Sequence, residues 1–533
     1  MKLFMWIVLL PSMALAETQL RVAFIQEWST INPVTNQLAS NEALFPFLTR
    51  KMVTRNAQGE VLPDVAESLP KLKGKVAIWK IRAKAHWGDG KTITCADWDL
   101  GWQAGLNPKV SASTRTEYEK IQKITWSEKD PKTCTVTYAQ ANWAYDRELP
   151  PLLPAHLEKA VYEKFKNEPE GYDRNSIYVS SPTNPGLYNG PYIISEFKLG
   201  SHAVLTRNKY FFGPTPQIDK IILQHIADTS ALKAHLLSNQ VDAVSAVGFP
   251  PDTALSFNEE FKASGAKFLV HFQNSSIMQG LFFNLDNEIL KSEGVREALS
   301  KAVDKEKLVK AFFKNTLVPA QGIIPPQHPS YSPFKSIFSK REANQLLEKE
   351  GWKLNENGIR TKNGKVLSFV FKTSAGIKVL ELIQQFICDG FKDIGVQCII
   401  KNEPPRLLLG SSVPKGEFDF VMFGQPIPPD SSLASYFSSK EIPSAKNSWT
   451  GGNSMRIRST DMDQLLNLFD KEMSSKQRHQ IMKDLQTLQQ KNFYFIPLYH
   501  RREAIVMPKA LSGLSEAYDG TSYNEPEKWR LAN

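Results

Sequence analysis

The sequence predicts an α/β protein with two or three domains. The chain has 533 residues, of which 41% are hydrophobic, and this is enough to bury more than one core. In residues 376–401 an amphipathic helix ends at Gly395 and a short apolar strand follows, and residues 475–500 repeat this order. Strands that alternate with helices are typical of α/β domains. The apolar helical positions are Leu380, Ile383, Ile387 and Phe391 in the first unit and Ile481, Leu485 and Leu488 in the second.

The N-terminus is typical of a secretory signal peptide. Lys2 precedes the apolar run 3–10, and Ala14-Leu15-Ala16 then provides an A-x-A cleavage site. The apolar run is too short to span a hydrocarbon core of about 30 Å. We therefore expect cleavage after Ala16 and a soluble, exported mature chain that begins at Glu17.

Four cysteines remain in this exported chain, and an even count is typical of disulfides in an oxidising compartment. Three pairings are possible, and the spacings favour local closure of Cys95 with Cys134 and of Cys388 with Cys398. A zinc site is the alternative, but no C-x-x-C or H-x-x-x-H motif accompanies these cysteines. We expect no metal and no cofactor.

The net charge of +10 is spread along the chain rather than gathered in one block. It is compatible with attraction of anionic ligands or envelope surfaces, and also with an ordinary basic surface. Because the chain is expected to be exported, we do not expect nucleic acid as a partner.

The segment 79–102 is rich in tryptophan and aspartate and has the appearance of a chemical site. Apolar and polar residues alternate from Trp79 to Trp87, which predicts a half-buried strand that enters a turn at residues 88–90. Thr94 and Asp97 have the spacing of a capping box, so a helix should begin there. The regularly spaced oxygen ligands of a calcium loop are absent. We interpret this segment as strand, turn and capped helix.

The same segment, W-x-I-R-x-x-x-x-W-x-D-G-x-x-I-T-x-x-D, resembles the family 5 extracellular solute-binding proteins, which are the dipeptide-, oligopeptide- and nickel-binding components of ABC importers. Further segments resemble this family in the same order along nearly the whole mature chain. They are residues 20–24, 59–70, 188–223, 231–244, 281–309, 319–326 and 342–352.

The resemblance implies a two-lobed periplasmic binding protein fold of type II, in the large peptide-binder class, with a hinge and an extra small domain. Lobe I would be discontinuous, with the small domain inserted after its first segment. The expected boundaries are 1–16 for the signal peptide, 17–45, 185–269 and 492–533 for lobe I, 46–184 for the extra domain, and 270–491 for lobe II.

Motifs of common catalytic sites are missing. No G-x-S-x-G, H-E-x-x-H, Walker loop or G-x-G-x-x-G occurs, and the nine histidines are scattered. We therefore expect a binding protein rather than an enzyme. Such a protein needs a cleft between lobes, aromatic walls and a few oriented polar groups.

In lobe I, residues 26–33 fall where the family places part of its cleft. Trp28 is a candidate wall of the site and Gln26 a candidate polar contact. Ordinary packing within the lobe is the alternative for Trp28.

In lobe II, residues 418–439 resemble the strand and loop that carry G-W-x-x-D in peptide binders, where the aspartate holds the ligand's α-ammonium. Here Gln425 and Ile427 are candidate ligand contacts. Pro428 stands at the aspartate position, and Asp430, the first nearby carboxylate, is a further candidate contact. Three prolines make this loop stiff. Unless Asp430 substitutes, strict recognition of a free peptide N-terminus is in doubt.

Residues 447–459 occupy a segment that returns to the cleft in the family. Trp449 and Asn453 are candidate ligand contacts, and Arg456 or Arg458 could bind an anionic group. A surface charge is the alternative for either arginine.

The resemblance thus implies a periplasmic protein that binds a peptide or peptide-like solute and delivers it to the permease subunits of an ABC importer. We expect a monomer. The alternatives are a non-peptide ligand (an oligosaccharide, an opine-like conjugate or a metal chelate) and a chemosensory role.

Overall fold

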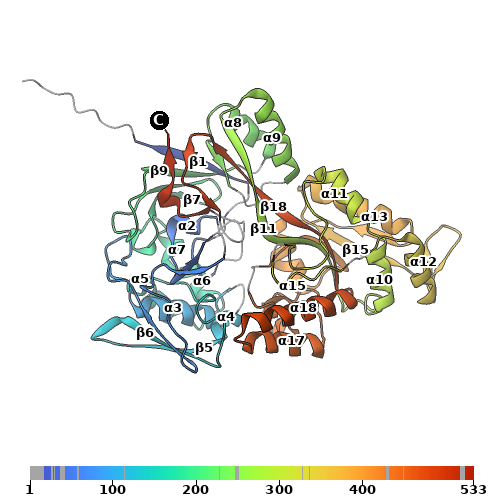
Figure 1. Cartoon of the computed structure of the whole chain (residues 1–533), viewed down its shortest axis with the longest axis horizontal. Coiled ribbons are helices and arrows are strands. Elements are labelled where there is room, and N and C mark those ends of the chain that lie inside the picture. The colour runs from blue at the N-terminus through green and yellow to red at the C-terminus, as the bar shows by residue number, and fades with distance from the viewer. Residues whose placement is uncertain are drawn as a thin grey trace, which may run out of the picture.

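Figure 1 shows two bodies joined by two long strands. The structure is a computed structural model, and it describes residues 17–25, 28, 30–35, 43–56, 59–112, 115–226, 228–245, 251–326, 328–334, 337–427, 431–447, 449–516 and 523–532. The predicted signal peptide lies outside these ranges. No helix in the described part of the chain is both long and apolar enough to cross a membrane.

A single mixed sheet of ten strands runs through both bodies. Five strands belong to the first lobe: β1 (Gln19–Phe24), β7 (Tyr192–Lys198), β8 (His202–Arg207), β9 (Lys220–His225) and β10 (Ala243–Val244). Three belong to the second lobe: β15 (Ser368–Thr373), β16 (Gln397–Ile400) and β17 (Phe420–Pro426). The two that join the lobes are β11 (Phe268–Phe283) and β18 (Phe495–Pro508). The strand order is β16-β15-β17-β11-β18-β10-β1-β9-β8-β7.

The two joining strands change partners halfway along their length. Near their first-lobe ends, β10 pairs with β18 through Val244 and Val506. At the second-lobe end, residues 277–283 of β11 pair with β17. Between these parts the β11–β18 register shifts between Asn274 and Met278. A break in the ladder bends and twists a strand pair locally, so this segment is the hinge between the lobes.

Helices cover the sheet in both lobes (Figure 1). The first lobe carries α2 (Phe45–Leu48), α8 (Thr229–Leu237) and α9 (Pro251–Ser264). The second lobe carries α10 (Glu293–Lys301), α11 (Lys305–Phe313), α12 (Lys340–Lys349), α13 (Lys378–Lys392), α16 (Ala434–Phe437), α17 (Thr460–Lys471) and α18 (Ser475–Lys491).

Both crossover units predicted from the sequence are present in the second lobe. The first is α13 followed by β16, which the Cys388–Cys398 disulfide joins. The second is α18 followed by β18. The predicted hairpin is formed by β13 (Arg360–Lys362) and β14 (Lys365–Val366), and its turn residues Asn363 and Gly364 both have positive φ. This backbone is the one that Asn-Gly favours in tight hairpins.

A small domain lies beside the first lobe. It contains two sheets. One sheet consists of β4 (Val76–Lys80), β5 (Ile121–Ser127) and β6 (Asp130–Tyr138), and the other consists of β2 (Val53–Arg55) and β3 (Val61–Pro63). Its helices are α3 (Cys95–Leu106), α4 (Thr116–Glu119), α5 (Ala155–Phe165), α6 (Gly171–Asn175) and α7 (Ile177–Ser180). Tyr162, Tyr172 and Tyr178 of this domain share one apolar core with first-lobe residues such as Leu205 and Ile221. The small domain and the first lobe therefore pack as one body.

The tryptophan-rich segment forms the core of the small domain. Trp79 and Trp98 are both fully buried and meet edge to face, with ring centroids 5.6 Å apart. The Cys95–Cys134 disulfide joins α3 to β6. The predicted capping box is present, because Thr94 N donates to Asp97 Oδ2 at 2.7 Å. The structural interpretation of this segment is confirmed.

The strand predicted from Trp79 to Trp87 is shorter than its alternating pattern suggests. β4 ends at Lys80, and Ala85 N donates to Arg82 O at 3.1 Å, so the chain turns at Ala83. Trp87 is nevertheless buried. The alternation reflects burial of the apolar residues rather than continuous pairing of the strand.

Candidate functional site at the lobe junction

Polar side chains gather at the hinge, where β11, β17 and β18 meet. Arg501 and Glu503 lie on β18, with 3.0 Å between Arg501 Nε and Glu503 Oε1. The Glu503 side chain is 2% exposed and the Arg501 side chain 21%. A Cβ built on Gly424 of β17 would lie 3.1 Å from Arg501 Nη1 and 3.4 Å from Gln279 Oε1 of β11. The arginine and the glutamine thus both lie close to Gly424, together with Ile277, whose Cγ2 would lie 2.8 Å from that Cβ.

Burial raises the pKa of Glu503, and the nearby Arg501 opposes this shift. A buried charge is costly unless it is paired, and perturbed carboxyl groups concentrate at functional sites. The motifs considered above do not include this cluster, yet the sequence carries a signal for it. Residues 500–503 are charged or polar, and they interrupt an otherwise apolar run of sequence from 494 to 507.

A second polar contact lies at the end of β17. Burial raises the pKa of Tyr436 to about 12, and Glu117 of the small domain adds to this shift, whereas a hydrogen bond with Gln425 opposes it. Gln425 is half-buried. The predicted contact residue Gln425 therefore lies near the place where the small domain approaches the second lobe.

The other predicted aromatic and acidic candidates have different surroundings. Trp28 is 1% exposed and meets Phe24 edge to face at 5.8 Å, and its buried indole N–H has no acceptor in the described part of the chain. Trp449 is 38% exposed. Gln26 and Asp430 lie outside the described residues.

Ile427 is held within the second lobe. Its backbone N–H donates to Ser276 O at 2.9 Å, and its side chain is 1% exposed in the apolar core that contains Leu433 and Phe437. Its contacts are those of a core residue.

Asn453 and Arg456 also make internal contacts. Asn453 Nδ2 donates to Ser438 O at 2.9 Å and Ile457 O at 3.0 Å. Arg456 Nη2 donates to Pro414 O at 2.8 Å, and Arg456 Nε lies 3.3 Å from Asp286. Both side chains are used to hold loops of the second lobe together, because buried polar groups need partners. The ligand roles predicted for Asn453 and Arg456 stay predictions.

The small domain also contacts the second lobe directly. Trp143 is 3% exposed and belongs to a core formed mainly by second-lobe residues. Its ring meets Phe469 of α17 edge to face at 5.4 Å, and the guanidinium of Arg478 in α18 lies 4.1 Å from a ring centroid. We call Trp143, Phe469 and Arg478 the latch.

Buried charges lie next to the latch. Lys120 of the small domain pairs with Glu148, and Glu148 Oε1 accepts a hydrogen bond of 3.2 Å from Ser432 N of the second lobe. Burial alone would lower the pKa of Lys120, but Glu148 and then Asp470 of α17 raise it. The latch and these charged groups thus bring the small domain into direct contact with the second lobe.

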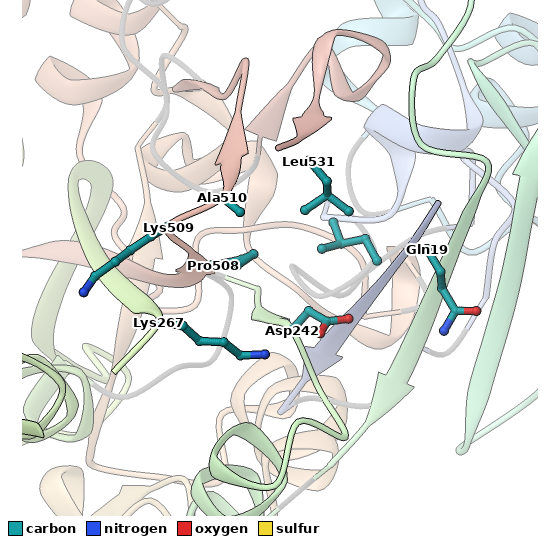
Figure 2. Close-up of a pocket in the computed structure, with 8 residues that line it drawn as sticks. Gln19, Asp242, Lys267, Pro508, Lys509, Ala510 and Leu531 are labelled. Atoms are coloured by element: carbon teal, nitrogen blue, oxygen red, sulfur yellow. The ribbon is translucent and has the colours of Figure 1, made fainter. Parts of the chain in front are cut away.

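The described residues contain no group of three or more histidine, cysteine, aspartate or glutamate side chains that could hold a metal ion. A pocket of about 340 Å³ lies at the end of β18 that is farthest from the second lobe, lined by residues such as Gln19, Lys267 and Lys509 (Figure 2). Its Asp242 carboxylate is already paired with Arg21 at 2.8 Å. This pocket is separate from the lobe junction.

Comparison with known proteins agrees with this architecture. The chain is 26% identical over 505 residues to the oligopeptide-binding protein AppA of Bacillus subtilis (strain 168), covering 92% of this chain and 86% of that protein. Among solved structures, the oligopeptide-binding protein from Thermus thermophilus complexed with a pentapeptide superposes with a TM-score of 0.84 and 21% identity, covering 96% of this chain and 95% of that one. NikZ from Campylobacter jejuni in complex with Ni(L-His) superposes with a TM-score of 0.81 and 24% identity, covering 96% and 99%.

The family model that describes the bacterial extracellular solute-binding proteins, family 5, matches residues 60–444 of this chain. The resemblance found in the sequence is thereby confirmed, and so is the two-lobed α/β fold that it implied. The chain belongs to the family 5 bacterial extracellular solute-binding proteins.

Proposed function

We propose that this protein captures a peptide between its lobes and delivers it to the permease subunits of an ABC importer. The observation that carries the proposal is the latch, where a small-domain tryptophan is buried among second-lobe residues, together with the hinge that joins the two bodies. A ligand that touches both bodies favours such a closed state, because it makes its full set of contacts only there.

The peptide class is supported by likeness to proteins whose names state it. AppA is an oligopeptide-binding protein, and the Thermus thermophilus relative was solved with a pentapeptide. NikZ has a similar fold and holds Ni(L-His), so a metal chelate is the outcome to test against. The absence of a metal-ligand cluster among the described residues does not decide between the two, because a chelate brings its own ligands.

The proposal includes the cellular setting and the division of the chain. The protein would be exported, cleaved after Ala16 and act as a periplasmic monomer without catalysis. Lobe I would comprise 17–45, 185–269 and 492–533, the extra domain 46–184 and lobe II 270–491.

Five of the residues predicted from the sequence remain candidates for ligand contact, and one of them, Gln26, lies outside the described residues. Trp28 supports this role through its indole N–H, which has no acceptor among the described residues. Gln425 supports it through its partly exposed side chain, and Trp449 through its exposed ring. Asp430 remains the candidate for the ligand's ammonium group.

Calorimetric titration of the mature protein with a panel of pentapeptides tests this proposal, with Ni(II)–histidine as the comparison ligand. We expect saturable binding of at least some peptides, lobe closure visible by small-angle scattering, and intact peptide recovered by liquid chromatography and mass spectrometry. Binding of the nickel chelate without any peptide, or cleavage of the peptide, would contradict it.

A further inference from the structure

The hinge contains an arginine whose surroundings are those of a ligand-binding group. In the β11–β18 ladder, Asn274 pairs with Arg502 and Met278 with His500, so Arg501 lies opposite the bulge formed by residues 275–277. It is therefore located where the strands of the two lobes diverge. A side chain at this position can contact groups from both lobes.

Glu503 holds one edge of the Arg501 guanidinium. Arg501 Nε lies 3.0 Å from Glu503 Oε1, and Arg501 Nη2 donates to Glu503 Oε2 at 3.3 Å. The remaining nitrogen, Nη1, makes no hydrogen bond in the described part of the chain. Arginine has five N–H donors in a rigid fork, and a second carboxylate can be bound by the donors that the first leaves free.

Nη1 packs closely against Gly424 of β17, and Gln279 of β11 supplies one more donor nearby. Gly424 has no side chain, and a Cβ there would lie 3.1 Å from Nη1. Gln279 is 1% exposed, and its Nε2 has no acceptor among the described residues. A buried amide donor without a partner is unfavourable, and an incoming acceptor would remove this cost.

We propose that Arg501, positioned by Glu503 and assisted by Gln279, binds a carboxylate of the ligand at the hinge. The inference rests on the proposed peptide function and deepens it, because it specifies which chemical group of the ligand is recognised and where. The carboxylate is either the C-terminus or an acidic side chain of the peptide. Because the arginine lies where the lobes meet, its contact with the ligand also ties binding to closure.

The test uses matched peptides and matched variants. One peptide that binds the wild-type protein is prepared with a free C-terminus and as its amide, and any aspartate or glutamate in it is replaced by the corresponding amide residue. Wild type should bind the carboxylate form roughly 10- to 100-fold more tightly than one of these neutral forms, as expected for a charge-assisted pair of hydrogen bonds.

Arg501→Gln should abolish that preference, weakening the carboxylate form by the same factor and the neutral form by less than about threefold. Arg502→Gln is the control, because Arg502 is the adjacent arginine but lies over the Phe272 ring, 5.4 Å from its centroid, and donates to Phe272 O. It should keep the preference. Arg501→Lys retains the charge without the fork, so it should keep only part of the preference, and it serves if Arg501→Gln does not fold.

Two results would overturn the inference while leaving peptide binding in place. One is a wild-type protein that binds all forms equally. The other is an Arg501→Gln variant that weakens the carboxylate and neutral forms by equal factors, which would assign Arg501 a purely structural role in the hinge. A wild-type protein that binds no peptide in any form would instead remove the proposed function itself.

Discussion

Truncation of the latch, Trp143→Ala, should weaken ligand binding although Trp143 is not among the proposed ligand contacts. The ring is 3% exposed in the closed state and has Phe469 and Arg478 of the second lobe as neighbours. An aromatic side chain buries roughly 150–250 Å², and if about half of this faces the second lobe, closure buries about 100 Å². At about 25 cal/mol per Å² this contributes about 2.5 kcal/mol, and the cation–π contact with Arg478 adds roughly 0.5–1 kcal/mol.

Loss of about 3 kcal/mol from the closed state should raise the apparent Kd by up to about 100-fold, because an open protein must close before it holds its ligand tightly. Calorimetry gives the Kd, and fluorescence energy transfer between labels on the small domain and the second lobe gives the closed fraction. Trp126→Ala is the matched control, since Trp126 is 37% exposed on β5 of the same domain. An unchanged Kd and closed fraction for Trp143→Ala would refute the latch.

Two further changes have defined outcomes. Burial, with nearby Lys305 adding to the effect, lowers the pKa of His500 from 6.5 to about 4. Between these two pH values the unfolded chain therefore binds a proton that the folded chain does not. About 3 kcal/mol of stability that is present above pH 6.5 is thus lost as the pH falls to 4. In His500→Gln this part of the pH dependence should vanish from urea titrations at a series of pH values, and an unaltered slope would disprove the assignment. Replacing Cys95 and Cys134 by serine opens a loop with a sequence separation of 39 and should lower the free energy of unfolding by about 3–4 kcal/mol. The loss should appear as a lower midpoint for unfolding of the small domain. An unchanged midpoint would contradict a stabilising role of the disulfide.

Local signals in the sequence were sufficient for much of the fold. The helical spacing of Ile383 and Ile387 predicted α13, and Asn363-Gly364 predicted the hairpin, because each element depends on residues close in the chain. The cysteine pairings followed from short spacings in the same way. The strand expected to reach Trp87 ends at Lys80, because alternating burial does not require a continuous ladder of backbone hydrogen bonds.

The candidate site was harder to predict, because it depends on residues far apart in the chain. Arg501 and Gln279 come together only when β18 and β11 pair across the hinge. Asn453 and Arg456 were assigned to the ligand from their position in the family segment, but their hydrogen bonds go to backbone groups of nearby loops. Position along a chain does not determine whether a polar side chain is already satisfied. The latch at Trp143 had no distinguishing motif at all.

Native mass spectrometry of the mature protein, gently purified after expression with its signal peptide, tests the central claim most directly. The account predicts a non-covalently bound mass that is released on activation and fragments as a series of amino acids. A bound nickel or sugar species that yields no amino-acid fragments would contradict the assignment of this protein as a peptide carrier.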